Sequence, residues 1–62
     1  MKLIKIKEVS ALTSLARATI YKYIAAGIFP GQVPLGANSV AWVESEVLEW
    51  IEQKIAQRDS QS

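Results

Sequence analysis

The architecture of this chain follows from residues 8–27, EVSALTSLARATIYKYIAAG. Apolar residues recur in this segment at the three- and four-residue spacing of an α-helix, in two separate runs. The runs are Val9 and Leu12, then Ile20, Tyr23, Ile24 and Gly27. Ser14 turns the chain between the runs and Leu15 closes the corner, while the small Ser10 suits two helices that cross closely. The pattern predicts two short helices joined by a tight turn, which is a helix-turn-helix.

The outer face of the second helix carries small residues and hydrogen-bond donors. Opposite Ile20 and Ile24 it presents Ala18, Thr19, Lys22, Ala25 and Ala26, with Arg17 and Tyr21 on the flanks. A helix that enters the major groove of DNA needs small residues for close approach and a few long donors for base edges or phosphates. Arg17, Thr19 and Lys22 supply the donors and Ala18 leaves room. An ordinary solvated face with two basic residues has the same composition, so this helix alone leaves both interpretations open.

The composition limits the class of protein. The chain has 62 residues, half of them hydrophobic, which predicts one small domain with one core and no room for an enclosed substrate cavity. It contains neither Cys nor His, so thiolate metal sites and the commonest general base are absent. The carboxylates of Glu46, Glu49 and Glu52 are expected on a solvated helix face. We therefore expect no enzyme, no cofactor and no metal site.

Targeting and membrane signals are not found in the sequence. Lys5 and Lys7 interrupt the N-terminal apolar run, and no apolar stretch approaches the length that crosses a bilayer. We expect no signal peptide, no membrane partner and a cytoplasmic location.

Charge is distributed unevenly along the chain. The net charge is only +1, but residues 1–22 carry five cations against one anion, a net of +4. Residues 23–43 carry no charged side chain, and residues 44–62 carry two cations against five anions, a net of −3. The basic half includes the outer face of the second helix, as expected for a protein with one face on a polyanion. Chance asymmetry in a small domain remains an alternative.

The N-terminal half is expected to hold a strand and two helices. We place them at residues 3–6, 7–13 and 16–26. Gly27 suits the left-handed residue that ends the second helix, and Pro30 prevents its continuation. Phe29 is then expected to anchor the chain in the core.

Residues 31–43 predict a β-hairpin. Its arms are expected at residues 32–35 and 39–43, with Val40 and Trp42 facing the core. Pro34 cannot donate to a strand ladder, so its arm should lie at an edge. A lone hairpin is barely stable, so it should pack on the helices or pair with the first strand. A hairpin in this position is a wing, which commonly touches the sugar-phosphate backbone beside the groove.

A third helix is expected from an N-cap at Ser45 to about Gln57. Its inner stripe comprises Val47, Trp50, Ile51 and Ile55. Trp42 and Trp50 lie on inward stripes, which favours a role in the core over base stacking. The fold class is α+β and mainly α, a winged helix-turn-helix domain at residues 1–57 followed by a flexible tail at 58–62.

Several short motifs in this order resemble the AlpA family of prophage regulators, which is grouped with excisionase and MerR-like winged-helix domains. They are LIKIKEV at 3–9, ALT at 11–13, L-x-R-x-TIYKYI at 15–24, G-x-FP at 27–30, LG at 35–36 and W-x-x-SEV-x-x-WI at 42–51. The resemblance covers almost the whole chain. It implies a sequence-specific DNA-binding regulator of a prophage or mobile element that controls integrase expression or assists excision.

By position, the resemblance assigns DNA contact to the second helix. Combined with the basic residues and the hairpin tip, the predicted DNA-binding residues are Arg17, Ala18, Thr19, Tyr21, Lys22, Lys5, Lys7, Asn38 and Ser39. Thr19 and Lys22 are the expected base readers, and the cations are expected to contact phosphates.

Two departures from the family pattern affect this assignment. Family members usually have Ser where this chain has Ala16, so the second helix lacks its usual cap unless Thr13 or Ser14 replaces it. The family's wing often carries Arg near its tip, where this chain has Asn38 and Ser39. A neutral wing predicts weaker binding.

With so few cations a single copy should bind DNA weakly. We expect useful binding to require several copies side by side, or a partner such as integrase or RNA polymerase. The alternative function is a protein-interaction adaptor that uses the same fold without DNA, through the acidic third helix or through Ala25, Ala26 and Ile28.

Overall fold

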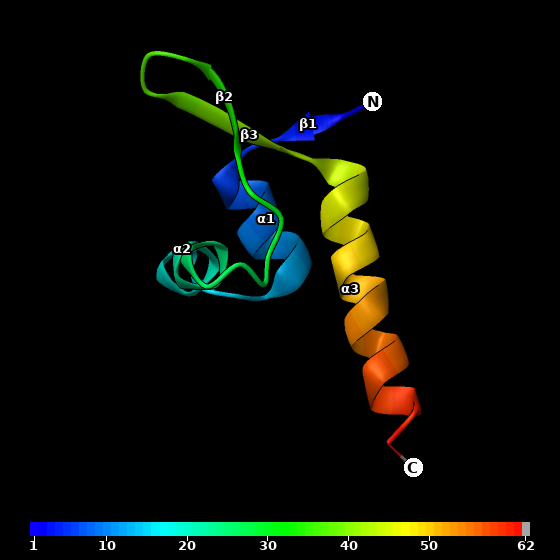
Figure 1. The fold of residues 1–62 in the computed structure, drawn as a ribbon. Coiled ribbons are helices and arrows are strands. Elements are labelled where there is room, and N and C mark those ends of the chain that lie inside the picture. The colour runs from blue at the N-terminus through cyan, green and yellow to red at the C-terminus, as the bar shows by residue number, and fades with distance from the viewer. Residues whose placement is uncertain (62) are drawn as a thin grey trace.

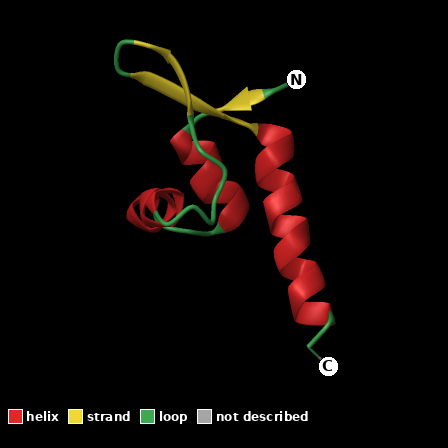
Figure 2. Ribbon diagram, in the orientation of Figure 1, coloured by secondary structure: helices red, strands yellow, loops and turns green. Residues whose placement is uncertain are grey.

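The computed structural model describes residues 1–61, and Ser62 lies outside the described residues. Its elements are β1 (Leu3–Ile4), α1 (Ile6–Thr13), α2 (Arg17–Ala25), β2 (Val33–Gly36), β3 (Ser39–Val43) and α3 (Glu44–Asp59). Figures 1 and 2 show the small sheet at one end of the molecule and the helices below it, with α1 between α2 and α3. The predicted fold class, an α+β and mainly α winged helix-turn-helix, is confirmed.

The corner between α1 and α2 is held by hydrogen bonds at the predicted turn. Ser14 adopts a left-handed conformation with φ 62°, and its N–H donates to the Ser10 carbonyl at 2.9 Å. The Ser10 hydroxyl donates to the Leu15 carbonyl at 2.6 Å, and the Thr13 hydroxyl accepts from the Leu15 N–H at 3.2 Å. A small hydroxyl residue at position 10 therefore both permits the close crossing and satisfies a carbonyl in the turn.

The end of α2 is a Schellman motif centred on Gly27. Gly27 has φ 76°, its N–H donates to the Ile24 carbonyl, and the Ile28 N–H donates to the Tyr23 carbonyl, both at 3.0 Å. This pair of bonds satisfies carbonyls that the last turn of a helix leaves free. The predicted helix end is confirmed, and the motif turns the chain toward Phe29.

The sheet has the order β1-β3-β2 and is antiparallel throughout. β1 pairs Leu3 with Val43 and Ile4 with Trp42, so the N-terminal strand supports the hairpin as expected. β2 lies at the edge, in agreement with the argument from Pro34. Its pairing with β3 is irregular between Pro34 and Gly36.

The core contains one residue from almost every part of the chain. Its buried members are Ile4, Val9, Ile20, Phe29, Trp42 and Val47. Trp42 is fully buried, and its Nε1–H donates to the Pro30 carbonyl at 3.1 Å. Trp50 is half-buried and packs against this cluster, so both indoles serve the core as predicted.

Element boundaries differ from the predictions by a few residues. The strand expected at 3–6 ends at Ile4, because the Lys5 carbonyl accepts the Glu8 and Val9 N–H groups and α1 begins at Ile6. The helix expected at 16–26 spans Arg17–Ala25, and the hairpin arm expected at 32–35 spans Val33–Gly36.

The prediction that Ser45 caps α3 is wrong. The extended residue before the helix is Val43, and Glu44 is already helical. The Glu44 N–H donates to the Lys2 carbonyl at 2.9 Å, so strand β1 satisfies one of the free donors at this helix start. α3 also continues to Asp59, past the predicted end at Gln57 and into the segment expected to be a tail.

The buried faces of α1 and α3 are shorter than predicted. Leu12 is 39% exposed and Ile55 is 44% exposed, although both were placed on buried faces. Ile55 is exposed because α3 extends beyond the neighbouring elements, which gives the whole molecule principal-axis dimensions of 46 × 24 × 19 Å (Figure 1). Among residues 1–61, no helix combines the length and apolar character needed to cross a bilayer.

The Schellman motif gives a stability prediction. Gly27→Ala places a side chain at a positive φ, which should lower the free energy of unfolding by about 1–2 kcal/mol. The matched control is Gly31→Ala, a site with open space around it and no positive φ, which should change stability little. Urea unfolding followed by tryptophan fluorescence measures both. Equal effects of the two substitutions would contradict a special role for Gly27.

Candidate nucleic-acid interface

Helix α2 separates a buried face from an exposed one. Ile20 is fully buried, and Tyr23 and Ile24 are half-buried against the core. The opposite side presents Arg17, Ala18, Lys22, Ala25 and Ala26, all exposed, with Thr19 half-buried. The division predicted from the helical spacing is therefore present, and the two cations and the three alanines lie on the same accessible face.

Tyr21 lies at the border of this exposed face. The residue is 42% exposed, yet its ring meets the buried Trp42 edge-on, with ring centroids 6.1 Å apart and an interplanar angle of 62°. Edge-to-face packing of this kind is favourable for two aromatic rings. The contact fixes α2 against β3, so the helix and the hairpin are held at a set separation.

Four cations of the N-terminal part have no carboxylate partner among residues 1–61. Within residues 1–61 the N-terminal ion pairs involve Lys2, which lies 3.8 Å from Glu8 and 3.5 Å from Glu44. In the described part of the chain, no carboxylate comes within 4.0 Å of Lys5, Lys7, Arg17 or Lys22. The positive charge of the first 22 residues is therefore available to an external anion.

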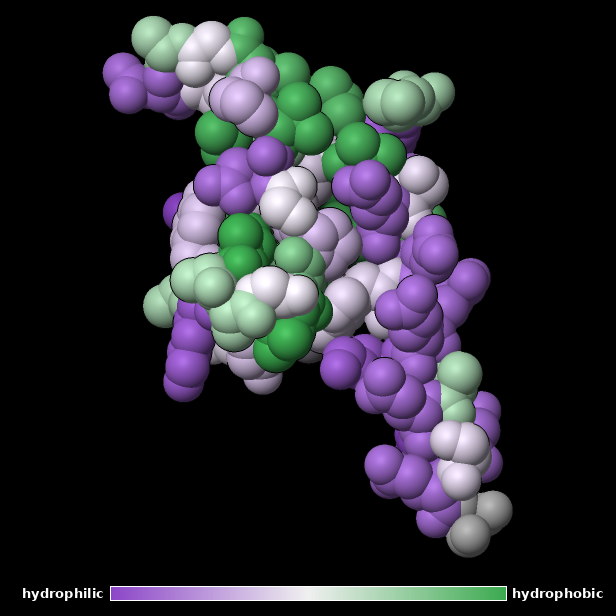
Figure 3. Space-filling view, in the orientation of Figure 1, coloured by the Kyte–Doolittle hydropathy of each residue, from purple (hydrophilic) through white to green (hydrophobic). Residues whose placement is uncertain are grey.

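The acidic residues occupy a different part of the molecule. Glu46, Glu49 and Glu52 are exposed on α3, which lies on the opposite side of α1 from α2 and the hairpin in Figure 1. Figure 3 shows hydrophilic residues along α3 and hydrophobic residues gathered over the sheet in the same view. Because the acidic side chains lie apart from the basic ones, one side of the fold is suitable for a polyanion.

Lys5 connects the N-terminal segment to the hairpin. Its Nζ donates to the Ser39 hydroxyl at 3.1 Å and to the Val40 carbonyl at 3.2 Å. Asn38 occupies the turn in a left-handed conformation with φ 61°, next to Ser39. Three residues that were predicted separately, Lys5, Asn38 and Ser39, thus lie together at one end of β3.

The first turn of α2 has no side-chain cap. Ala16 occupies the N-cap position with φ −66° and ψ 151°, and no side chain accepts a hydrogen bond there. Ser14 instead caps the end of α1, and the Thr13 hydroxyl is used within the turn. The structure therefore settles the alternatives left open for this cap in favour of Ala16. Arg17 begins the helix beside these free N–H groups.

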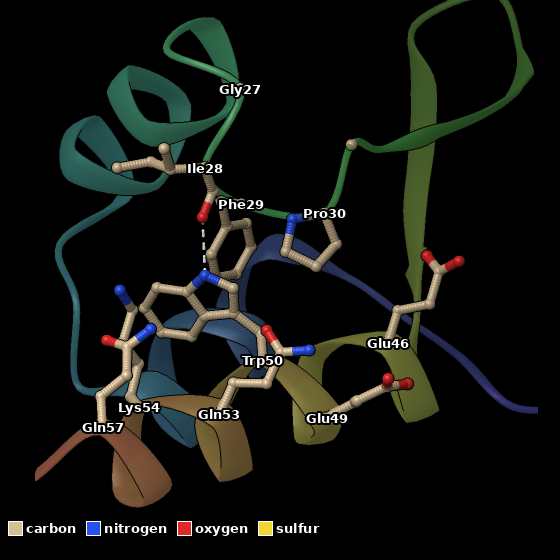
Figure 4. Close-up of a pocket in the computed structure, with 11 residues that line it drawn as sticks. Gly27, Ile28, Phe29, Pro30, Glu46, Glu49, Trp50, Gln53, Lys54 and Gln57 are labelled. Carbon is tan, nitrogen blue, oxygen red and sulfur yellow. Dashed lines mark hydrogen bonds between the residues drawn. The ribbon is translucent and has the colours of Figure 1, made fainter. Parts of the chain in front are cut away.

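An open groove of about 620 Å³ lies between α3 and the loop after α2 (Figure 4). Trp50 is at its centre, and its Nε1–H donates to the Ile28 carbonyl at 2.6 Å, while Phe29 meets the indole edge-on at 4.8 Å between centroids. Glu46 and Glu49 lie at one end. The indole N–H is committed to the backbone, so Trp50 ties the end of α2 to α3. No group of residues within 1–61 is arranged to hold a metal ion.

Sequence reasoning missed three of these contacts. They are Lys5 with Ser39 and Val40, Tyr21 with Trp42, and Trp50 with the Ile28 carbonyl. All three join residues more than 20 positions apart, and no periodicity indicates such pairs. The one available signal concerned Lys5, whose long side chain has a charged end and follows a strand that was predicted to pair with the hairpin.

The comparison with protein families decides the relationship. The sequence model of a family described as "Prophage CP4-57 regulatory protein (AlpA)" matches residues 2–55. The chain belongs to the AlpA family. The resemblance drawn from the short motifs is therefore confirmed, and the winged helix-turn-helix elements described above all begin within the matched residues.

Two known proteins have clear sequence similarity to the chain. "Uncharacterized protein ORF88" of Enterobacteria phage P4 is 46% identical over 57 residues, which cover 92% of this chain and 65% of that protein. "DNA-binding transcriptional activator AlpA" of Escherichia coli (strain K12) is 33% identical over 60 residues, which cover 87% of this chain and 86% of that protein. The chain thus spans 65% of the length of the phage relative.

The uncapped start of α2 gives a second stability prediction. Ala16→Ser should raise the free energy of unfolding by about 1 kcal/mol, because a serine at an extended N-cap accepts a backbone N–H. Ala25→Ser, at the exposed end of the same helix, is the control and should give no gain. Thermal unfolding followed by circular dichroism compares the two. A gain at position 25 equal to that at 16 would contradict the capping argument.

Proposed function

We propose that this AlpA-family chain is a DNA-binding regulator of a prophage or other mobile element, with α2 as its recognition helix. The observation that carries the proposal is the exposed face of α2, where Arg17 and Lys22 are accessible and have no carboxylate of residues 1–61 within 4.0 Å. The E. coli relative, which is described as a DNA-binding transcriptional activator, supports the same conclusion.

In the proposed complex α2 enters the major groove with its exposed face. Ala18 allows the helix to approach the bases closely, and Thr19 and Lys22 reach base edges. Arg17 and Lys7 contact phosphates, which set the position of the helix along the duplex. Tyr21, held by Trp42, lies at the margin of the groove with its hydroxyl available as a donor or acceptor.

A single domain with this charge should bind DNA weakly. Few phosphates are neutralised, and non-specific and specific affinity both depend on that number. We infer that regulation uses several copies on adjacent sites, or a second protein such as integrase or RNA polymerase. In this role the chain controls integrase expression or assists excision of the element.

The central test is Lys22→Ala in a binding titration with duplex DNA from the intergenic region beside the gene. The substitution should weaken binding about 5- to 100-fold if Lys22 reads a base, since a good base contact contributes roughly 1–3 kcal/mol. Lys54→Ala, on α3, is the matched control and should bind nearly as the parent does. Equal binding by the Lys22 variant and the parent would remove α2 from the interface.

The salt dependence of the parent protein tests the electrostatic part. If Lys5, Lys7, Arg17 and Lys22 each neutralise one phosphate, the plot of log affinity against log salt should slope at about −3.6. A flat plot would contradict phosphate contacts. A protein-binding adaptor would not shift even a random-sequence duplex in a gel at low salt, which distinguishes that alternative.

A further inference from the structure

The hairpin has no charge of its own with which to attract DNA. No charged side chain occurs between residues 23 and 43, a range that includes both hairpin strands and the turn. A neutral hydrogen bond to a phosphate is weaker than one in which the donor is also charged. On its own sequence, the hairpin is therefore a poor partner for a polyanion.

The structure places a cation on the hairpin from elsewhere in the chain. Lys5 lies between β1 and α1, 34 positions before Ser39, yet its Nζ is 3.1 Å from the Ser39 hydroxyl and 3.2 Å from the Val40 carbonyl. Pairing of β1 with β3 is what brings these segments together. Both hydrogen bonds are exposed to solvent, so an external ligand has access to the ammonium.

The hydrogen-bond donors of Lys5 and Ser39 are only partly used within the protein. A lysine ammonium has three N–H donors, and the two hydrogen bonds to the hairpin use two of them. The Ser39 hydroxyl accepts from Lys5, so its own proton remains available for donation. Two donors and one positive charge therefore converge, and within residues 1–61 no carboxylate lies within 4.0 Å of Lys5 to neutralise it.

We propose that Lys5 and Ser39 form one phosphate-binding site beside the hairpin turn, in which Lys5 supplies the cation that the hairpin lacks. The ligand is a phosphodiester group of duplex DNA, so the site rests on the proposed function. Ser39 directly follows the hairpin turn, and this turn lies away from the acidic α3 in Figure 1, which agrees with this ligand. The contact would give the duplex a second point of attachment beside α2.

A purely structural role for Lys5 makes a different prediction. Solvent-exposed hydrogen bonds that hold the hairpin would affect its position but would not add a counterion-releasing contact to DNA. The number of phosphate contacts is read from the salt dependence of binding, because each contact contributes about 0.9 to the slope. The slope therefore separates phosphate binding from hairpin positioning.

The experiment measures affinity for a random-sequence DNA duplex by fluorescence anisotropy across a series of salt concentrations. Lys5→Met should make the slope shallower by about 0.9. Ser39→Ala should weaken binding with little change in slope, and the double variant should bind no more weakly than Lys5→Met, because the two residues act on one phosphate. Adding Ser39→Lys to Lys5→Met should restore the slope by returning a cation to the same place.

Two further variants serve as controls. Lys2→Met should leave the slope unchanged, because Lys2 is paired with Glu8 and Glu44. Arg17→Met should make it shallower, which reports on α2 alone. Urea unfolding of each variant verifies that it is folded under the conditions of the titration.

The outcomes separate the two proposals. If Arg17→Met makes the salt-dependence slope shallower and Lys5→Met does not, the Lys5–Ser39 site is overturned while DNA binding by α2 stands. A slope that stays shallow after Ser39→Lys is added also contradicts a site beside the hairpin turn. If the parent protein does not bind duplex DNA at low salt, the proposed function fails and this site fails with it.

Discussion

The burial of Trp42 is the constraint on which the rest of the fold depends. Its indole is fully buried in a core to which β1, α1, α2, α3 and the loop after α2 each contribute one buried residue, and its N–H donates to the Pro30 carbonyl. A chain of 62 residues buries a smaller fraction of its surface than a larger domain does, so one large side chain that packs against several elements is an efficient core. The contact between Trp42 and Tyr21 extends this arrangement to the exposed side of α2. The orientation of the proposed recognition helix is therefore a direct result of core packing.

The separation of positive from negative charge leaves one side of this small domain suitable for a polyanion. Lys2 is paired with both Glu8 and Glu44 near the start of α3, whereas the cations around α1 and α2 stay free of carboxylates in the described residues. The net charge of +1 hides this division, because it averages a basic N-terminal part with an acidic α3. The proposed DNA-binding face depends on that distribution rather than on the total.

The order of elements could be predicted from the sequence because it rests on local signals. The spacing from Ile20 to Gly27 defined α2 and its end, and Pro34 correctly placed its strand at the edge of the sheet. Ser45 was assigned as a cap from its residue type alone, but the backbone of Lys2 supplied the partner at that helix start. Ile55 was assigned to the core because periodicity describes which residues share a helix face and not where the neighbouring structure ends. The link from Lys5 to Ser39 depends on strand pairing and was outside the reach of any local pattern.

The length of α3 has a mechanical consequence. The helix has 16 residues and so measures about 24 Å, but only its first turns pack on the core. Its last turns form a stiff rod that points away from the hairpin (Figure 1). A fluorophore or fused protein attached beyond Asp59 would be carried on this rod, clear of the proposed recognition surface and with little freedom to swing back across it.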